Sequence, residues 1–138
     1  MFSYGQVETL IARIYGASAK VQAGALRGRI RHLRRLGLPI GISPGTGTPI
    51  EYGKEQVYEL AFCLGLEQCG VDPRLAVRLL KKHRTFILHT YAKAEEAIQK
   101  NEGYFFWLET DFMSASWSST KRKFPGLPTI SAGSIRSG

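Results

Sequence analysis

The segment Gly24–Gly37 constrains the fold of this chain more than any other stretch. It reads Gly-Ala-Leu-Arg-Gly-Arg-Ile-Arg-His-Leu-Arg-Arg-Leu-Gly. Leu26, Ile30 and Leu33 recur every three to four residues, which predicts a helix with one buried face. Four arginines fall on the side away from that face: Arg27, Arg31, Arg34 and Arg35. Gly37 suits the residue that closes a helix. We therefore predict a short helix that is apolar on one side and rich in guanidinium groups on the other.

The distribution of charge favours a polyanionic partner. The chain has 138 residues, 43% of them hydrophobic, and a formal net charge of +8, which suits one domain, or one small domain with an appendage. Residues 1–50 hold seven of the nineteen Lys and Arg and one carboxylate, Glu8, whereas residues 51–120 are slightly acidic. The tail from Lys121 adds four more cations. Positive charge concentrated in this way favours nucleic acid over a membrane.

The residues before the basic segment complete the pattern of a helix-turn-helix. Ser3 is a suitable N-cap for a helix that begins at Tyr4 and ends near Gly16. Residues 17–19 form a compact turn, and Lys20–Ala23 fits either a loop or the first turn of the basic helix. Two helices joined by a short turn that contains glycine, the second of them basic, is the layout of a helix-turn-helix.

A turn-rich segment, Gly41–Tyr52, follows the basic helix. Gly and Pro interrupt it too often for a helix, and Ile42 and Ile50–Tyr52 flank its centre. We expect a two-stranded β-wing with its tip at Pro44–Thr48, where backbone N–H groups could approach a phosphate. A nucleotide-binding loop is the weaker alternative, because the Lys-Ser/Thr ending of a P-loop is missing.

Further helices are predicted after the wing. Residues 53–68 form a helix so apolar that the domain core or a second subunit must cover most of its sides. Asp72–Pro73 opens another helix, with Asp as the N-cap and Pro in the first turn. Thr85–His89 fits either a strand or a helix extension, and residues 91–100 fit a helix.

The C-terminal part is predicted to hold a hairpin and a disordered tail. Residues 104–108 form a buried strand and residues 112–117 its hairpin partner. The fold class is therefore mainly α with small β elements (α+β), a winged helix-turn-helix followed by a small helix and a β-hairpin. The predicted parts are a DNA-binding domain over residues 1–84, a dimerisation or partner module over 85–120, and a disordered basic tail rich in Ser, Gly and Pro over 121–138.

Short motifs in this order resemble the MerR family of winged helix-turn-helix regulators. Ile30–Leu38 resembles the end of the family's recognition helix, and Ile50–Tyr52 resembles its outgoing wing strand. Gln56–Leu60 and Glu67–Arg74 resemble the paired helices that follow. The resemblance covers about residues 3–84 and implies a DNA-binding domain. No heptad-patterned dimerisation helix follows, so it does not imply the family's coiled-coil dimer, and the family's metal-sensing cysteines have no counterpart.

The arginines of the basic helix are the first candidates for DNA contact, and Arg31 matches the recurrent recognition-helix arginine of the family. Truncating a base-reading Arg should cost about 1–3 kcal/mol at its base pair, whereas losing a phosphate contact weakens all sequences alike. The predicted DNA-binding residues are Arg27, Arg29, Arg31, His32, Arg34, Arg35, Ser18, Lys20, Thr46, Thr48, Tyr52 and Lys54. The alternatives are a solvated basic face for the cations and packing against the core for Tyr52.

The sequence predicts no catalytic site, no cofactor and no metal site. Cys63 and Cys69 lack a nearby set of further ligands, and Glu95–Glu96 fits a solvated helix face. An aromatic cluster near the C-terminus is either core or a dimer or partner surface: Phe105, Phe106 and Trp107.

Together these features lead us to expect a sequence-specific regulator of transcription that binds double-stranded DNA, and not an enzyme. The basic helix would enter the major groove and the wing would hold the flanking backbone. We expect a homodimer, because one short helix gives limited specificity, with RNA polymerase or another DNA-bound protein as a further candidate partner. The alternatives are an excisionase-like or architectural accessory factor and a protein-interaction adaptor. With no apolar run that could span a bilayer and no signal peptide, we expect a cytoplasmic, nucleoid-associated protein.

Overall fold

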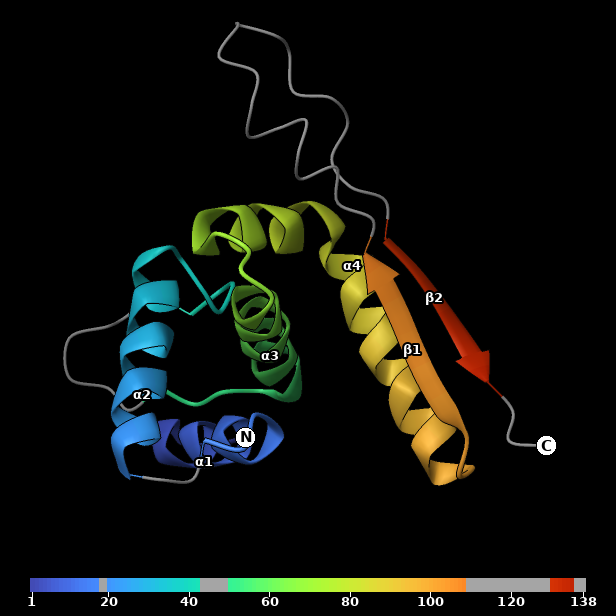
Figure 1. Cartoon of the computed structure of the whole chain (residues 1–138), viewed down its shortest axis with the longest axis horizontal. Coiled ribbons are helices and arrows are strands. Elements are labelled where there is room, and N and C mark those ends of the chain that lie inside the picture. The colour runs from blue at the N-terminus through green and yellow to red at the C-terminus, as the bar shows by residue number, and fades with distance from the viewer. Residues whose placement is uncertain (18–19, 43–49, 109–129, 136–138) are drawn as a thin grey trace, which may run out of the picture. The chain divides into compact units, whose positions relative to one another are not determined.

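The computed structural model describes residues 1–17, 20–42, 50–108 and 130–135, with side chains described for 1–17, 23–42 and 50–102. Its elements are four helices and two strands: α1 (Tyr4–Ile14), α2 (Lys20–Arg35), α3 (Lys54–Gln68), α4 (Pro73–Gln99), β1 (Gly103–Leu108) and β2 (Ile130–Ile135) (Figure 1). The chain divides into two compact units, Met1–Leu88 and His89–Gly138.

Local signals fix both ends of α1 as predicted. The Ser3 hydroxyl accepts a hydrogen bond from the Gln6 N–H at 3.4 Å, and the Gln6 side chain accepts one from the Ser3 N–H at 2.8 Å. These two bonds form a capping box, which satisfies backbone donors at the start of the helix. Gly16 follows the helix with a φ of +65°, a left-handed conformation that ends helices and suits glycine.

The basic helix α2 begins before the first residue of its apolar stripe, Leu26. It begins at Lys20, so Lys20–Ala23 belongs to the helix and not to a loop. Leu26, Ile30 and Leu33 are buried, which confirms the predicted stripe. Gly37 has a φ of +90° and lies just beyond the helix end, again as predicted.

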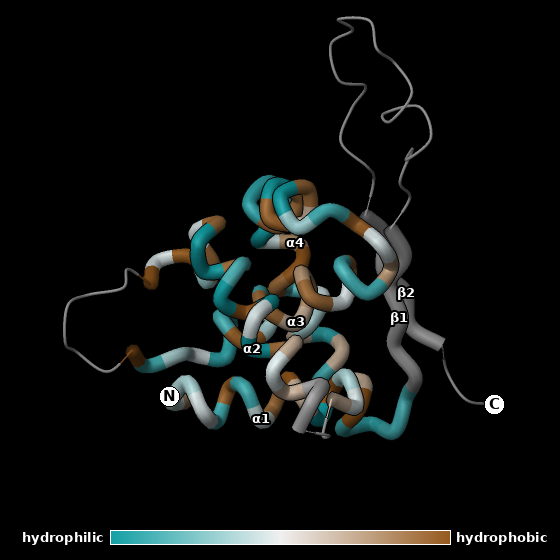
Figure 2. The backbone as a smooth tube through the Cα atoms, turned by 60° about the vertical axis from the view of Figure 1, so that its left-hand side comes forward, coloured by the Kyte–Doolittle hydropathy of each residue, from teal (hydrophilic) through white to brown (hydrophobic). Residues whose placement is uncertain are grey.

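The central helix of the first unit is α3, which packs against both α1 and α2. It buries side chains around most of its circumference over Val57–Leu64. The hydropathy-coloured tube shows hydrophobic residues on all of these helices (Figure 2). Tyr15, which follows α1, donates a hydrogen bond from its hydroxyl to the Ala61 carbonyl of α3. An apolar helix of this kind forms the core on which amphipathic helices pack.

The predicted wing is wrong for the residues described. Ile42, Ile50 and Glu51 belong to no strand. Tyr52 instead forms an isolated antiparallel bridge with Phe2, with N–O distances of 2.7 and 2.8 Å between their backbones. Phe2 therefore binds the backbone N–H and C=O groups of Tyr52, which we expected to pair with the other strand of the wing. The wing tip, Pro44–Thr48, lies outside the described residues.

In the second half of the chain, α4 runs through the segment that fitted either strand or helix. Thr85–His89 is helical, and His83 alone has non-helical backbone angles, with φ −112° and ψ 21°. Within its own unit, β1 pairs antiparallel with β2, from Gly103 opposite Ile135 to Leu108 opposite Ile130.

Two predictions about the C-terminal part are corrected by this pairing. The partner of β1 is Ile130–Ile135, in the tail that we expected to be disordered, and not residues 112–117, which lie outside the described residues. Tail composition suggested disorder, but strand pairing depends on a distant partner that composition does not report. The predicted α+β winged fold is thus replaced by a helical one, in which residues 1–102 contain no strand where they are described.

Candidate nucleic-acid interface

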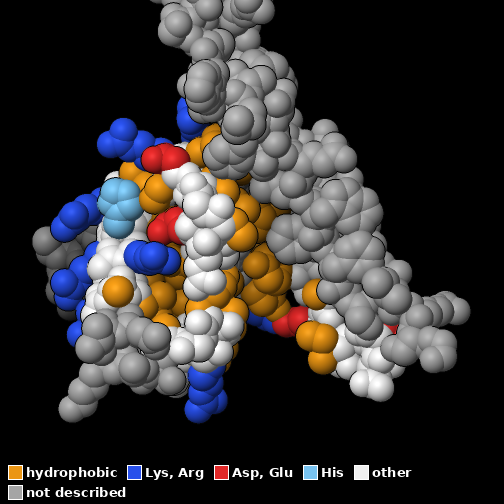
Figure 3. Space-filling view, in the orientation of Figure 1, with side chains coloured by type: hydrophobic (Ala, Val, Ile, Leu, Met, Phe, Trp, Pro, Cys, Tyr) orange, Lys and Arg blue, Asp and Glu red, His pale blue; other side chains and the backbone are white. Residues whose placement is uncertain are grey.

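The outward face of α2 carries exposed cations, as its amphipathic pattern predicts. In Figure 3 the Lys and Arg side chains gather along the edge of the molecule that α2 forms. Besides Arg27, the exposed members of this face are Arg29, Arg31, His32 and Arg35. None of these four forms an ion pair with a carboxylate among the described residues. This face therefore presents positive charge to solvent without an ion pair in the described part of the chain.

Arg27 differs from the other arginines of α2 in the described part of the chain, because it forms an ion pair, with Glu8 of α1. Its Nη2 atom lies 2.8 Å from Oε1 of Glu8, and its Nε atom lies 3.1 Å from both carboxylate oxygens. The hydrogen bonds to Glu8 raise the pKa of Arg27. The pair joins the two helices of the predicted helix-turn-helix, so the guanidinium group is already engaged within the protein.

Arg34 lies over the ring of Tyr4, the first residue of α1. Its guanidinium carbon is 5.9 Å from the centre of the Tyr4 ring, a cation–π contact. The Tyr4 and Tyr52 ring centres are 6.4 Å apart. Burial raises the pKa of the Tyr4 hydroxyl, and the carboxylate of Glu8 acts in the same direction. The Tyr4 ring thus restricts where the half-buried Arg34 side chain can lie.

On its other flank α2 faces the last turn of α3. Burial raises the pKa of the Glu67 carboxyl, while the charges of Arg29 and His32 lower it. The Oε1 atom of Glu67 is buried with no hydrogen-bond partner among the described residues. Arg29 and His32 therefore lie within electrostatic reach of an acidic group, whereas no ion pair in the described part of the chain links Arg31 or Arg35 to a carboxylate.

A hollow of about 270 Å³ lies at the C-terminal end of this face. Its lining combines three arginines with two apolar residues from the turn after the helix: Arg31, Arg34, Arg35, Leu38 and Ile42. A surface of this composition can bind an anionic group and cover the apolar atoms next to it.

The turn that floors this hollow is held by Glu59, a residue that the sequence analysis missed. Glu59 is a fully buried carboxylate of α3. It accepts a hydrogen bond of 2.7 Å from the Ile40 N–H and an ion-paired one of 2.7 Å from Nε of Arg84. Arg84 also reaches Glu55, at 2.9 Å. A lone Glu inside the apolar run of residues 57–64 was the available signal, since a buried charge needs a partner.

The remaining predicted DNA-binding residues are Tyr52, which is buried, Lys54, which is exposed, and several residues whose side chains are not described. Tyr52 is 1% exposed, so its hydroxyl does not reach a phosphate, and the packing alternative holds. Lys54 is exposed, with its Nζ atom 5.9 Å from the centre of the Tyr58 ring. The other candidates have no described side chain: Ser18, Lys20, Thr46, Thr48, Phe105, Phe106 and Trp107. The backbone of Lys20 belongs to α2, and that of the three aromatic residues belongs to β1.

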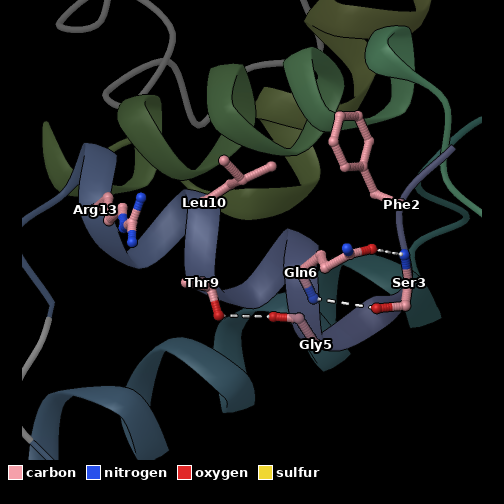
Figure 4. A pocket seen from close by; sticks show the side chains of 7 residues that line it. All are labelled: Phe2, Ser3, Gly5, Gln6, Thr9, Leu10 and Arg13. Carbon is pink, nitrogen blue, oxygen red and sulfur yellow. Dashed lines mark hydrogen bonds between the residues drawn. The ribbon is translucent and has the colours of Figure 1, made fainter.

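Other candidate sites in the described part are weaker. A hollow of about 480 Å³ is lined by residues of α1 and of the segment before it: Phe2, Ser3, Gly5, Gln6, Thr9, Leu10 and Arg13 (Figure 4). Its polar groups largely bond to one another in the helix cap and in the bond from the Thr9 hydroxyl to the Gly5 carbonyl. Cys63 and Cys69 are free thiols, and burial raises the pKa of Cys63.

The described residues contain neither a cluster of metal ligands nor a membrane-spanning helix. No three His, Cys, Asp or Glu side chains gather there in a way that could hold a metal ion. None of the described helices has the length and apolar character needed to cross a membrane. Comparison with known protein families, with curated proteins and with solved structures finds no match to this chain.

Proposed function

We propose that this protein binds double-stranded DNA in a sequence-specific manner and regulates transcription, with α2 in the major groove. The observation that carries the proposal is the exposed arginine face of α2, which has a buried apolar face behind it and no carboxylate paired with its outermost arginines in the described part of the chain. A helix of this width fits the major groove, where Arg binds guanine edges and phosphates.

The contacts of α2 suggest how the helix is presented. Glu8 anchors Arg27 to α1, and the Leu26–Leu33 stripe packs towards α3. Arg31 and Arg35, one helical turn apart, remain for DNA. The helix fixes where these two side chains start, so binding has to order the side chains but not the backbone that carries them.

A homodimer would double the sequence read by one short helix, so the proposal includes two copies on a site with two-fold symmetry. RNA polymerase or another DNA-bound protein is the further partner that such a regulator would meet. Neither partner is needed for the primary test.

The primary test is selection of bound sequences from a random duplex library, followed by fluorescence anisotropy on the enriched sequence. We expect the double variant Arg31→Ala/Arg35→Ala to lose about 2–6 kcal/mol of binding free energy, at about 1–3 kcal/mol for each arginine. Arg74→Ala removes an exposed arginine from the start of α4 and is the matched control, with unchanged affinity expected.

Failure would take either of two forms. The library could show no enrichment, or the double variant could bind the enriched sequence as tightly as the control. A DNA affinity that does not change with salt would favour the protein-interaction adaptor, since phosphate contacts make DNA affinity fall as salt rises.

A further inference from the structure

The hollow at the end of α2 combines three arginines of the helix with two apolar residues of the turn that follows it. Arg31, Arg34 and Arg35 lie at positions i, i+3 and i+4, so their side chains share one side of the last two turns. The chain then reverses at Gly37 and brings Leu38 and Ile42 beneath them. Since no described carboxylate pairs with these three arginines, their charge is available to a ligand.

The lining has two parts with different chemistry. Guanidinium groups bind phosphate oxygens through paired N–H donors, whereas the apolar turn offers no hydrogen bond. A fully hydrated inorganic ion gains nothing from that apolar floor. A DNA strand, by contrast, carries a sugar next to each phosphate, and the sugar's C–H surface can cover the partly exposed Ile42.

We propose that this hollow binds one backbone phosphodiester of a DNA strand, with the adjoining sugar on Ile42, which lines the hollow together with the buried Leu38. The proposal rests on the proposed DNA binding and deepens it by assigning Arg34 to the backbone. Arg34 therefore contributes equally to all sequences, because every sequence has the same phosphate and sugar.

Both halves of the hollow are held in place before any ligand arrives. On one side the Tyr4 ring lies 5.9 Å from the Arg34 guanidinium carbon. On the other, Glu59 accepts the 2.7 Å hydrogen bond from Ile40, and the Ile42 N–H donates to the Pro39 carbonyl at 3.3 Å. A buried carboxylate therefore fixes the floor, which lowers the cost of ordering this turn on binding.

The test measures binding of the full chain to short duplexes of unrelated sequence and to the enriched duplex. Arg34→Gln should weaken binding to all of them by the same factor, roughly tenfold, and should lower the magnitude of the slope of log affinity against log salt by about 0.9. Arg34→Lys should restore the slope, since it keeps the charge. Arg74→Gln is the control and should change neither quantity.

Two outcomes of the duplex measurements would overturn the proposal while leaving DNA binding intact. In one, Arg34→Gln binds every duplex as the unaltered protein does. In the other, it loses affinity only for the enriched sequence, which would make Arg34 a base-reading residue.

A second arm separates a DNA strand from free phosphate as the source of the ligand. The side-chain Nε–H signals of isotope-labelled full chain are followed by NMR during titration with the dinucleotide thymidylyl-thymidine, which has one phosphodiester, and with inorganic phosphate. We expect the dinucleotide to shift the signals of Arg31, Arg34 and Arg35 at lower concentration than phosphate does. Equal or stronger shifts with phosphate would overturn the assignment to a strand. If the unaltered protein binds no duplex, the proposed function fails. The dinucleotide titration then shows by itself whether the hollow binds a phosphodiester.

Discussion

At the scale of single residues, the arginines of α2 have the same side chain but different surroundings. Arg27 is paired with Glu8 of α1, Arg34 lies over the Tyr4 ring, and Arg31 has no described ion-pair partner. Contacts within the protein therefore give the arginines different roles: an arginine in an ion pair stabilises the fold, and one without such a pair can bind a ligand.

Glu8→Gln should release Arg27 and tighten the binding of unrelated duplexes under the proposed function. The variant removes one negative charge and the ion-pair partner of Arg27, so the basic face gains a free cation. Fluorescence anisotropy over a salt series should show higher affinity and a steeper slope. Glu55→Gln, which removes an exposed carboxylate on α3, is the control. Equal effects of the two variants would mean that net charge, and not Arg27, is responsible.

Tyr15 should make the folded protein less stable at alkaline pH. Burial raises the pKa of Tyr15 from 10.0 to about 12, with the nearby Cys63 acting in the same direction. The unfolded chain therefore loses this proton first, so the free energy of unfolding should fall as pH rises from 10 towards 12. Below that range Tyr15 is neutral in both states and contributes no pH dependence.

Urea denaturation at several pH values compares the unaltered chain with Tyr15→Phe. The variant should be less stable at neutral pH by about 1 kcal/mol, because it loses the hydrogen bond to Ala61. Its stability should fall less steeply at alkaline pH. Parallel curves for the two proteins would contradict the assignment of that pH dependence to Tyr15.

At the scale of helices, two glycines with the same low helix propensity have different effects on the stability of the protein. Gly28 lies in α2 with open space where a Cβ would be, whereas a Cβ on Gly65 of α3 would lie 2.9 Å from the Tyr15 hydroxyl oxygen. Gly28 is thus a cost to its helix, and Gly65 allows Tyr15 to approach α3.

Gly28→Ala should therefore stabilise the protein by about 0.5–1 kcal/mol, the gain in helix propensity. Gly65→Ala should destabilise it by roughly 1 kcal/mol, since the clash with Tyr15 exceeds that gain. Thermal and urea unfolding measure both. Stabilisation by Gly65→Ala would show that Tyr15 moves aside at little cost. Weaker DNA binding by the more stable Gly28→Ala would show that Gly28 admits the close approach of DNA.

The Glu59 carboxylate should be the main polar link between α3, α4 and the turn after α2. Removing one partner of a buried ion pair costs about 3–5 kcal/mol; because Arg84 is one-third exposed and retains Glu55, we expect roughly 2–3 kcal/mol for Glu59→Ala. Glu55→Ala, at a 59% exposed side chain, should cost about 0–1 kcal/mol in the same urea measurement. Similar values for the two variants would mean that Glu59 is not a strong link.

At the scale of the whole molecule, the chain consists of two compact units. The first, Met1–Leu88, holds the basic face, the hollow and the core around α3. The second, His89–Gly138, contains the β1–β2 pair, whose side chains include the aromatic residues predicted as a dimer or partner surface. Binding and assembly can therefore be tested separately.

The full chain should be a dimer in solution, and a chain that ends at Leu88 should be a monomer. We expect the shortened chain to keep the helical circular dichroism of its helices and to bind DNA more weakly, because two linked α2 helices bind as one unit only in a dimer. Sedimentation equilibrium measures the state of assembly. A shortened chain that dimerises as strongly as the full one would place the dimer contact in the first unit.

Much of the helical framework could be predicted from the sequence, because its signals are local. Ser3, Gly16 and Gly37 mark helix ends through their own backbone bonds and φ preferences, and the Leu26–Leu33 spacing defines the buried side of α2. The cationic face of α2 follows from the same periodicity, since whatever lies opposite a buried stripe is exposed.

Tertiary structure alone decided the pairings between distant residues. Tyr52 pairs with Phe2 and not with a wing strand, and β1 pairs with a strand in the tail. Likewise the partners of Arg27 and Glu59 come from other helices. Periodicity reports which side of an element is buried but not which element covers it, because backbone and charge pairing depend on contacts far apart in the chain. The arginine-rich helix was thus determined by its sequence, whereas the hollow at its end depends on a turn that a distant residue, Glu59, holds through its hydrogen bond with the Ile40 N–H.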